Sequence, residues 1–179
     1  MTLPLRRRDT SNFNKDWNTC KVGFGDDLFV NPNSYNFFIG LEKLHQLTQQ
    51  ASYRFELYID YYTNYNYDYN TQQGSAIYHN FTIGPESESY ALTFDPFDTV
   101  ASTIDNGFSS SPPLKFEADG KYLCYKYGGV AAWFGSDCEG YTVFTDGQFR
   151  WTVNGPYSTQ YIVKMLEFRL VRSSAFYEG

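Results

Sequence analysis

The chain of 179 residues has little cysteine, little basic charge and no long apolar run. It contains three cysteines and two histidines, and neither His45 nor His79 lies near a Cys-x-x-Cys pair, so the spacing of a zinc site is missing. No stretch approaches about 18 consecutive apolar residues, which argues against a membrane-spanning helix. Lys and Arg number 14 against 20 Asp and Glu, and the net charge of -6 argues against a nucleic-acid-binding surface.

The first residues of the sequence, Met1 to Arg8, lack the apolar segment of a secretory signal. We therefore expect the sequence to be a fragment or to carry a start that differs from the natural one. Its only basic cluster is Arg6-Arg7-Arg8, which we interpret as the solvated flank of a strand rather than as a phosphate-binding patch. The odd number of cysteines means that one of them is unpaired within this chain or pairs outside it.

Aromatic residues are abundant: they make up 20% of the chain, with 17 Tyr and 16 Phe. Disordered chains are poor in aromatics, so this composition indicates a folded protein. The length fits one domain, 1–179, with a core of its own. Tyr-rich sequence punctuated by glycine favours an extracellular, β-rich fold.

Local patterns predict an α+β fold with a loop-rich C-terminal region. Leu41 to Gln49 has leucines three residues apart and is predicted to be a short amphipathic helix. Apolar residues alternate in Tyr53 to Asp60, which predicts a half-buried strand. The remaining segments are assigned as strands at 76–83 and 90–94, an exposed hairpin tip at 61–70, little regular structure at 95–119, and a central closing strand at 161–171.

A short segment with a cysteine at each end, Cys124 to Cys138, contains the adjacent aromatics Trp133 and Phe134. A disulfide closing a loop of this size would stabilise the fold by about 3 kcal/mol. Such a loop would present the two aromatics on a rigid rim beside carboxylates, which is a candidate recognition site. The alternative for Trp133 and Phe134 is ordinary core or rim packing.

A series of motifs spread over nearly the whole chain resembles the fibrinogen-related domain, the globular C-terminal module of fibrinogen chains, ficolins and tenascins. In chain order the motifs are Arg7-Arg8-Asp9, Trp17, Gly23-Phe24-Gly25, Phe38 to Thr48, Tyr53 to Asp60, Phe81 to Tyr90, Asp105-Asn106-Gly107, Cys124 to Cys138, Trp151 and Lys164 to Leu170. The resemblance implies a twisted antiparallel sheet with short helices. It also implies a disulfide between Cys124 and Cys138.

The chain departs from this family in three places. It opens at Thr2, inside a strand that follows the family's N-terminal subdomain, so we expect that subdomain to be absent. Counting back from Cys124 puts Leu114 to Ala118 where the family has its calcium loop, and leucine, phenylalanine and lysine do not ligate calcium. We therefore expect no cofactor, although Glu117 and Asp119 could hold a weak ion in a shifted register.

Cys20 is a further departure, since an aromatic is usual at its position in the family, and the ligand pocket is the third of the main ones. Three interpretations stay open for it: a free thiol, a link to another chain, or a small buried residue. The first two would give the cysteine a chemical role, and the third would make it part of the core.

The family's ligand pocket lies next to the second cysteine of the pair and accepts acetyl groups or a peptide. The resemblance assigns the corresponding residues here, which are Tyr127, Trp133, Phe134, Asp137, Cys138, Glu139 and Asp146. Glu139 replaces the family's histidine, so the pocket is acidic and favours a cationic ligand. The alternative for the three carboxylates is that they are solvated loop residues.

The sequence thus predicts a secreted, non-enzymatic recognition or adhesion module, of the kind used in innate immunity, that binds a glycan, an acetylated group or a peptide beside the Cys124–Cys138 loop. The alternative is a protein-interaction or structural module whose ligand pocket has decayed. Neither histidine has a nucleophile signature nearby, and no carboxylate pair suggests a glycosidase. Asn80-Phe81-Thr82 is an N-glycosylation sequon, which matters only if the chain is exported.

Overall fold

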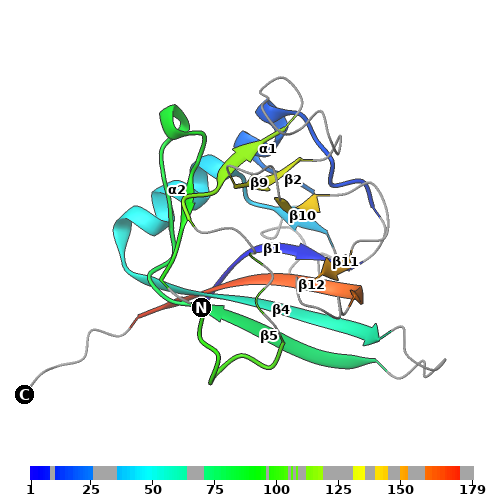
Figure 1. Ribbon diagram of the computed structural model, residues 1–179. Coiled ribbons are helices and arrows are strands. Elements are labelled where there is room, and N and C mark those ends of the chain that lie inside the picture. Colours follow the sequence, from blue (N-terminus) through cyan, green and yellow to red (C-terminus); the bar gives the residue numbers. More distant parts are fainter. Residues whose placement is uncertain are drawn as a thin grey trace, which may run out of the picture.

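A computed structural model describes residues 1–8, 11–25, 36–63, 71–95, 97–104, 106, 108, 112–118, 131–135, 140–144, 150–152 and 160–173. In these parts the strands form a seven-stranded sheet, a three-stranded sheet and a two-stranded sheet. Two short α-helices, α1 (Trp17–Val22) and α2 (Leu41–Gln50), pack with them. Figure 1 shows the long strands of the large sheet below, with both helices and the three-stranded sheet above them. This is the α+β arrangement predicted from the sequence.

The seven-stranded sheet has the order β2-β3-β1-β12-β4-β5, and β11 also pairs with β12. Every strand pair in it is antiparallel. The strands are β1 (Thr2–Arg7), β2 (Phe24–Gly25), β3 (Phe37–Phe38), β4 (Tyr53–Thr63), β5 (Gln72–Tyr78), β11 (Arg150–Thr152) and β12 (Gln160–Arg172). The predicted closing strand is confirmed as a central one, because β12 lies between β1 and β4.

Alternation along the two longest strands separates a core face from an outer face. Leu57 of β4 lies opposite Phe168 of β12, and both are buried in the main core. One residue further along, Tyr58 lies opposite Glu167 on the other side of the sheet, which we call the outer face. The predicted strand at Tyr53 to Asp60 is confirmed and continues to Thr63, so the predicted hairpin tip begins later. Residues 64–70 of that tip lie outside the described part of the chain.

The predicted helix is confirmed as α2, and its leucine spacing explains how it packs. Leu41 and Leu44 are buried in the core, while the side chain of Glu42 on another face accepts a hydrogen bond from Gln46 Nε2 at 2.9 Å. Gly40 precedes the helix with a φ of 100°, a conformation that favours glycine. A Cβ atom there would lie 2.5 Å from the carbonyl oxygen of Val22, so α1 and α2 meet closely only because this residue is glycine.

The predicted strand at 76–83 is wrong as a single element. It divides into the end of β5 and a short strand β6 (Thr82–Ile83), which pairs with β7 (Leu92–Thr93). The interruption lies at Asn80, whose φ of 47° turns the chain, after which the Phe81 N–H donates to the carbonyl of Tyr53. The turn redirects the chain from the large sheet toward α2.

Two neighbouring strand predictions also need correction. The strand predicted at 90–94 is reduced to Leu92–Thr93, because Ser89 and Tyr90 both have positive φ, 56° and 46°. A one-turn 3-10 helix, η1 (Glu86–Glu88), precedes them. The segment predicted to be irregular at 95–119 contains one strand, β8 (Lys115–Glu117), which belongs to the three-stranded sheet.

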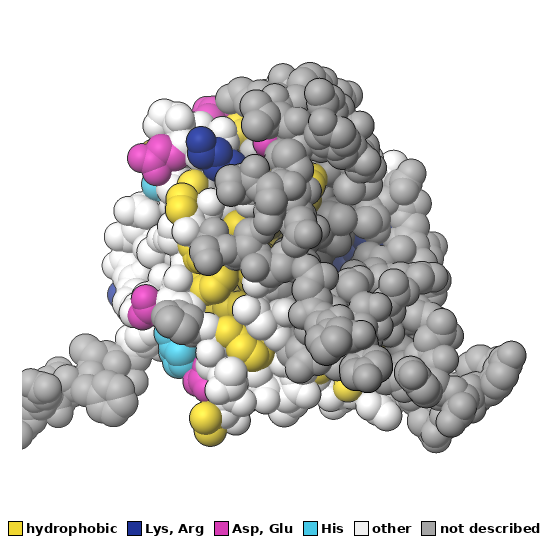
Figure 2. All heavy atoms as spheres, viewed as in Figure 1, with side chains coloured by type: hydrophobic (Ala, Val, Ile, Leu, Met, Phe, Trp, Pro, Cys, Tyr) yellow, Lys and Arg dark blue, Asp and Glu magenta, His cyan; other side chains and the backbone are white. Residues whose placement is uncertain are grey.

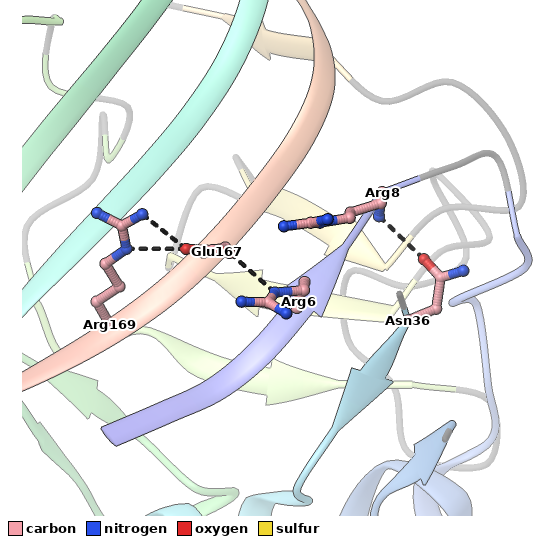
Figure 3. A network of polar contacts seen from close by, with 5 residues as sticks. All are labelled: Arg6, Arg8, Asn36, Glu167 and Arg169. Carbon is pink, nitrogen blue, oxygen red and sulfur yellow. Dashed lines mark hydrogen bonds and ion pairs between the residues drawn. The ribbon is translucent and has the colours of Figure 1, made fainter. Parts of the chain in front are cut away.

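The interpretation of Arg6-Arg7-Arg8 as a solvated flank is wrong for Arg7. Arg7 lies in β1 opposite Leu166 and is fully buried, with its guanidinium carbon 5.0 Å from the centre of the Phe13 ring. Arg6 points to the outer face, where its Nε donates to Glu167 at 2.8 Å. Figure 3 shows Glu167 between Arg6 and Arg169, whose Nε and Nη2 donate to it at 2.9 and 2.7 Å. Arg8 is exposed.

Cys20 is a free cysteine and is buried in the core, so two of the three interpretations left open, a free thiol and a small buried residue, hold together. It lies in α1, and its Sγ contacts the carbonyl oxygen of Lys15 at 3.6 Å. Burial raises the pKa of the thiol to about 12, and the negative charge of Asp16 acts in the same direction. Within the described ranges, no helix is both long and apolar enough to cross a membrane.

Candidate functional site

The described part of the predicted site lies in the three-stranded sheet, which has the order β10-β9-β8. Its central strand is β9 (Ala131–Phe134), and β10 (Gly140–Phe144) follows it in antiparallel pairing. The start of β9 is fixed by the Ala131 N–H, which donates to Asn14 Oδ1 at 3.0 Å. Trp133 and Phe134 are neighbours in β9, so their side chains leave the strand on opposite faces.

Trp133 faces the core. Its side chain is 2% exposed, and its indole Nε1 donates to the carbonyl oxygen of Tyr90 at 3.0 Å. Its ring meets the ring of Phe116 edge to face, with centroids 4.9 Å apart and an interplanar angle of 71°. These contacts give Trp133 a packing role, the alternative that the sequence left open, and a contact with a ligand stays a prediction.

The aromatic cluster behind Trp133 extends to α1. Trp17 lies 6.0 Å from Phe116 and 5.8 Å from Tyr90, measured between ring centroids. The Trp17 indole Nε1 donates to Glu86 Oε1 at 3.0 Å, and Lys21 Nζ donates to the other oxygen of Glu86 at 2.6 Å. Each buried indole therefore has a hydrogen-bond acceptor, which fixes the orientation of the ring that carries it.

Tyr90 connects this cluster to α2 through a strained backbone. Its φ of 46° is uncommon for a bulky residue, and it is held by the hydrogen bond from its own N–H to the Pro85 carbonyl at 3.1 Å. Its hydroxyl donates to Glu42 Oε2 at 2.8 Å. Burial raises the pKa of Tyr90, and the hydrogen bond from Tyr90 is the main cause that lowers the pKa of Glu42.

Phe134 lies on the face of β9 that points away from the core. It is 9% exposed and forms a small apolar cluster with Ala132, separate from the main core. The pairing with β8 places Lys115 opposite Phe134 and Glu117 opposite Ala132, so these four residues share one face of the sheet. Lys115 is exposed. This face therefore holds a largely buried aromatic ring beside a positive and a negative side chain.

The structure separates the two predicted aromatics rather than bringing them together. The other predicted site residues, Tyr127, Asp137, Cys138, Glu139 and Asp146, lie outside the described residues, as does Cys124. The Cys124–Cys138 disulfide therefore stays a prediction. Lys115 was missed as a neighbour of Phe134, because the sequence does not show that residues 115–117 form a strand beside β9.

The segment that replaces the family's calcium loop does not fit calcium. Leu114 and Phe116 are fully buried, and Phe116 packs between Trp17 and Trp133. Its backbone is engaged as well, since the Phe116 N–H donates to the Ser89 carbonyl at 2.9 Å. Calcium needs several oxygen ligands that converge on one point, whereas this segment supplies packing groups. No group of three or more His, Cys, Asp or Glu side chains in the described ranges could hold a metal ion.

The two histidines have partners that do not suggest catalysis. His45 Nδ1 lies 2.7 Å from the Ile83 carbonyl oxygen, and His79 Nε2 lies 2.8 Å from Asp98 Oδ2. Figure 2 shows one face of the molecule, on which hydrophobic side chains of the described residues form a band.

Comparison with known sequences identifies the family. The model of the family described as "Fibrinogen beta and gamma chains, C-terminal globular domain" matches residues 1–154. The chain therefore belongs to this family, and the resemblance predicted from its motifs is confirmed. It is 30% identical to the fibrinogen gamma chain of Xenopus laevis over 129 residues, which cover 64% of this chain and 28% of that protein. It is 35% identical to fibrinogen-like protein 1 of Bos taurus over 101 residues, covering 56% of this chain and 29% of that one. The chain thus spans less than a third of the length of either relative.

Solved structures share the fold. The fibrinogen-like globe domain of human ANGPTL2 superposes with a TM-score of 0.68 at 21% identity, covering 96% of this chain and 79% of that one. Lamprey fibrin D-dimer, solved with the peptide ligand Gly-His-Arg-Pro-amide, gives a TM-score of 0.62 at 24% identity and covers 99% of this chain and 64% of that one. The predicted fibrinogen-like α+β fold is thereby confirmed.

Proposed function

We propose that the chain is an extracellular, non-enzymatic recognition module that binds a cationic ligand on the Phe134 face of β9. The observation that carries this proposal is that the two neighbouring aromatic residues of β9 lie on opposite faces of the strand. Trp133 is fixed in the core by its hydrogen bond to the Tyr90 carbonyl, while Phe134 lies on the other face. A rigid strand that presents an aromatic ring is a suitable floor for a ligand, because it loses little conformational entropy on binding.

The charges proposed around this floor select the ligand. Asp137, Cys138 and Glu139 lie in the sequence between β9 and β10, and Asp146 follows β10. With Tyr127 and Phe134 they complete the proposed site, in which three carboxylates outweigh Lys115. Carboxylates attract an amine or a guanidinium, and the ring of Phe134, which is 9% exposed, adds an apolar contact.

A short peptide with a free amine and an arginine is the ligand class that we favour over a glycan or an acetylated group. The lamprey structure that shares the fold holds such a peptide, Gly-His-Arg-Pro-amide. The net charge of -6 adds a general attraction for cations. The Cys124–Cys138 disulfide is part of the proposal, since it would hold the loop that carries Tyr127 against β9.

The test is calorimetric titration of Gly-His-Arg-Pro-amide into the chain, with an N-acetylated glycan in parallel. Binding of the peptide should weaken at least tenfold, or about 1.4 kcal/mol, in the double variant Asp146→Asn with Glu139→Gln. It should also weaken in Phe134→Ala. The matched control is Glu88→Gln, which removes an exposed carboxylate from η1 and should leave the affinity unchanged. Equal binding by the double variant would refute the acidic site.

Peptide mapping with and without reduction tests the disulfide separately. We expect Cys124 and Cys138 to be joined and Cys20 to be free. A bridge that includes Cys20, or three free thiols, would remove the loop constraint from the proposal.

A second function is favoured by one observation, the buried side chains of Leu114 and Phe116 at the place of the calcium loop. A domain that has replaced this loop with packing residues could serve as a protein-interaction or structural module with a decayed ligand pocket. A flat response to both peptide and glycan arrays, together with capture of a defined protein partner, would support this alternative over the first.

A further inference from the structure

The sequon Asn80-Phe81-Thr82 occupies the turn between β5 and β6. Asn80 is exposed, and its positive φ of 47° is one that asparagine tolerates better than most residues. Phe81 is 2% exposed and faces the core, whereas Thr82 begins β6. The sequence contains 12 asparagines, and Asn80 is the only one that begins an Asn-x-Ser/Thr pattern.

The hydrogen bonds of Asn80 leave room for a substituent on its amide nitrogen. Nδ2 donates to Asp95 Oδ2, and Oδ1 accepts from Ser52 Oγ at 3.3 Å. A primary amide has two N–H groups, and the bond to Asp95 uses one of them. An oligosaccharide can therefore replace the other hydrogen while both hydrogen bonds of the folded turn are kept.

We propose that Asn80 carries an N-linked oligosaccharide. The donor is a lipid diphosphate-linked oligosaccharide: the amide nitrogen forms a bond to the anomeric carbon, the bond from that carbon to the diphosphate breaks, and the lipid diphosphate leaves with the electron pair while the amide gives up one proton. The reaction involves no change of oxidation state. The proposal rests on the extracellular location proposed above, because the donor is used only on exported chains.

The oligosaccharide would cover the end of the molecule at which Asp98 and Val100 lie. His79 precedes Asn80 and pairs with Asp98, whose Oδ1 accepts from the Val100 N–H at 3.0 Å. Val100 is 94% exposed. This apolar residue is connected to the residue before Asn80 through Asp98. Figure 1 shows the end of β5 at the lower left of the molecule and β10 in its upper part. A glycan on Asn80 therefore shields the Val100 end.

The test is to secrete the full chain from a eukaryotic cell behind a supplied signal peptide and to measure its mass before and after enzymatic removal of N-glycans. We expect one oligosaccharide on the wild-type chain and conversion of Asn80 to aspartate after its removal. Asn80→Gln and Thr82→Val should both lack it. Thr82→Ser should retain it.

A matched control separates loss of the sequon from loss of a local hydrogen bond. Thr82 Oγ1 lies 2.5 Å from Thr93 Oγ1, so Thr82→Val and Thr93→Val remove the same hydrogen bond from its two sides. Only the first destroys the sequon, and Thr93→Val should remain fully glycosylated. Wild-type chain that reaches the medium without a glycan would overturn the proposal. Peptide binding measured on the same sample is independent of it, so the two proposals fail separately.

Discussion

Neutralising Glu167 tests whether charge pairing holds the outer face of the seven-stranded sheet together. The Glu167 side chain is 7% exposed and accepts three hydrogen bonds, one from Arg6 and two from Arg169. Hydrogen bonds to charged groups contribute about 1.5–3 kcal/mol each, and removing one partner of a buried pair costs about 3–5 kcal/mol. Both arginines remain partly hydrated, since 18% of the Arg6 side chain and 23% of the Arg169 side chain are exposed. We therefore expect Glu167→Gln to lower the free energy of unfolding by about 2–3 kcal/mol.

Urea denaturation and thermal unfolding measure this loss. For a chain of 179 residues, 2–3 kcal/mol corresponds to a fall in Tm of roughly 4–12 °C. The control is Glu56→Gln, because Glu56 lies 4.0 Å from Arg169 and the substitution should cost less than about 0.5 kcal/mol. A double-mutant cycle with Arg6→Gln should give a positive coupling energy. A Glu167→Gln variant that is as stable as Glu56→Gln would refute the reasoning, since the network would then contribute nothing beyond a surface pair.

Three further predictions address the packing of the helices and the aromatic cluster. Gly40→Ala should destabilise the fold by about 2 kcal/mol or more in urea, because the new methyl group meets a backbone oxygen at 2.5 Å and the φ is 100°; an unchanged midpoint would contradict this contact. Cys20 should resist alkylation at pH 8 until the protein unfolds, since raising the thiol pKa from 9.0 to about 12 lowers the thiolate fraction on the order of a thousandfold; rapid labelling of its peptide in the native protein would refute its burial. Tyr90→Phe should cost about 1 kcal/mol at about pH 7 and progressively less toward pH 3. The reason is that the lowered pKa of Glu42 makes this stabilisation complete above the ordinary pKa and lost as the pH falls through the folded value; a cost that does not vary with pH would exclude Glu42 as the partner.

Periodicity predicted the elements in which burial alone sets the pattern. The leucines of α2 and the alternating residues of β4 repeat at the spacing of their element, so both were predicted within a few residues of their ends. β12 was predicted as central from its length and apolar content, and it is paired on both sides. These assignments need no knowledge of which segment the element packs against.

Features that depend on one backbone angle or one distant neighbour were not predictable. The break in the strand at 76–83 depends on the positive φ of Asn80, and an asparagine in a sequence does not reveal it. Arg7 was misassigned because charge favours solvent, whereas its place opposite Leu166 in β1 puts it inside.

The candidate site was predictable only in part. Alternation implies that Trp133 and Phe134 point to opposite faces, but the sequence does not say which of them meets the core. The Tyr90 carbonyl decides this, and it comes from a turn 43 residues away in the chain. The sequence did not predict that Lys115 lies beside Phe134 for the same reason, because the two residues belong to different strands.

The position of β12 has a consequence for the order in which the protein can fold during synthesis. β1 and β4 do not pair with each other, because β12 lies between them, and Thr2 at one end of the chain lies opposite Leu170 near the other. Until the ribosome has released residue 172, β1 and β4 each keep one edge that has not yet found its partner. Unpaired edges of this kind invite pairing with other chains. The nascent chain therefore exposes these two strand edges for the whole interval before β12 is made.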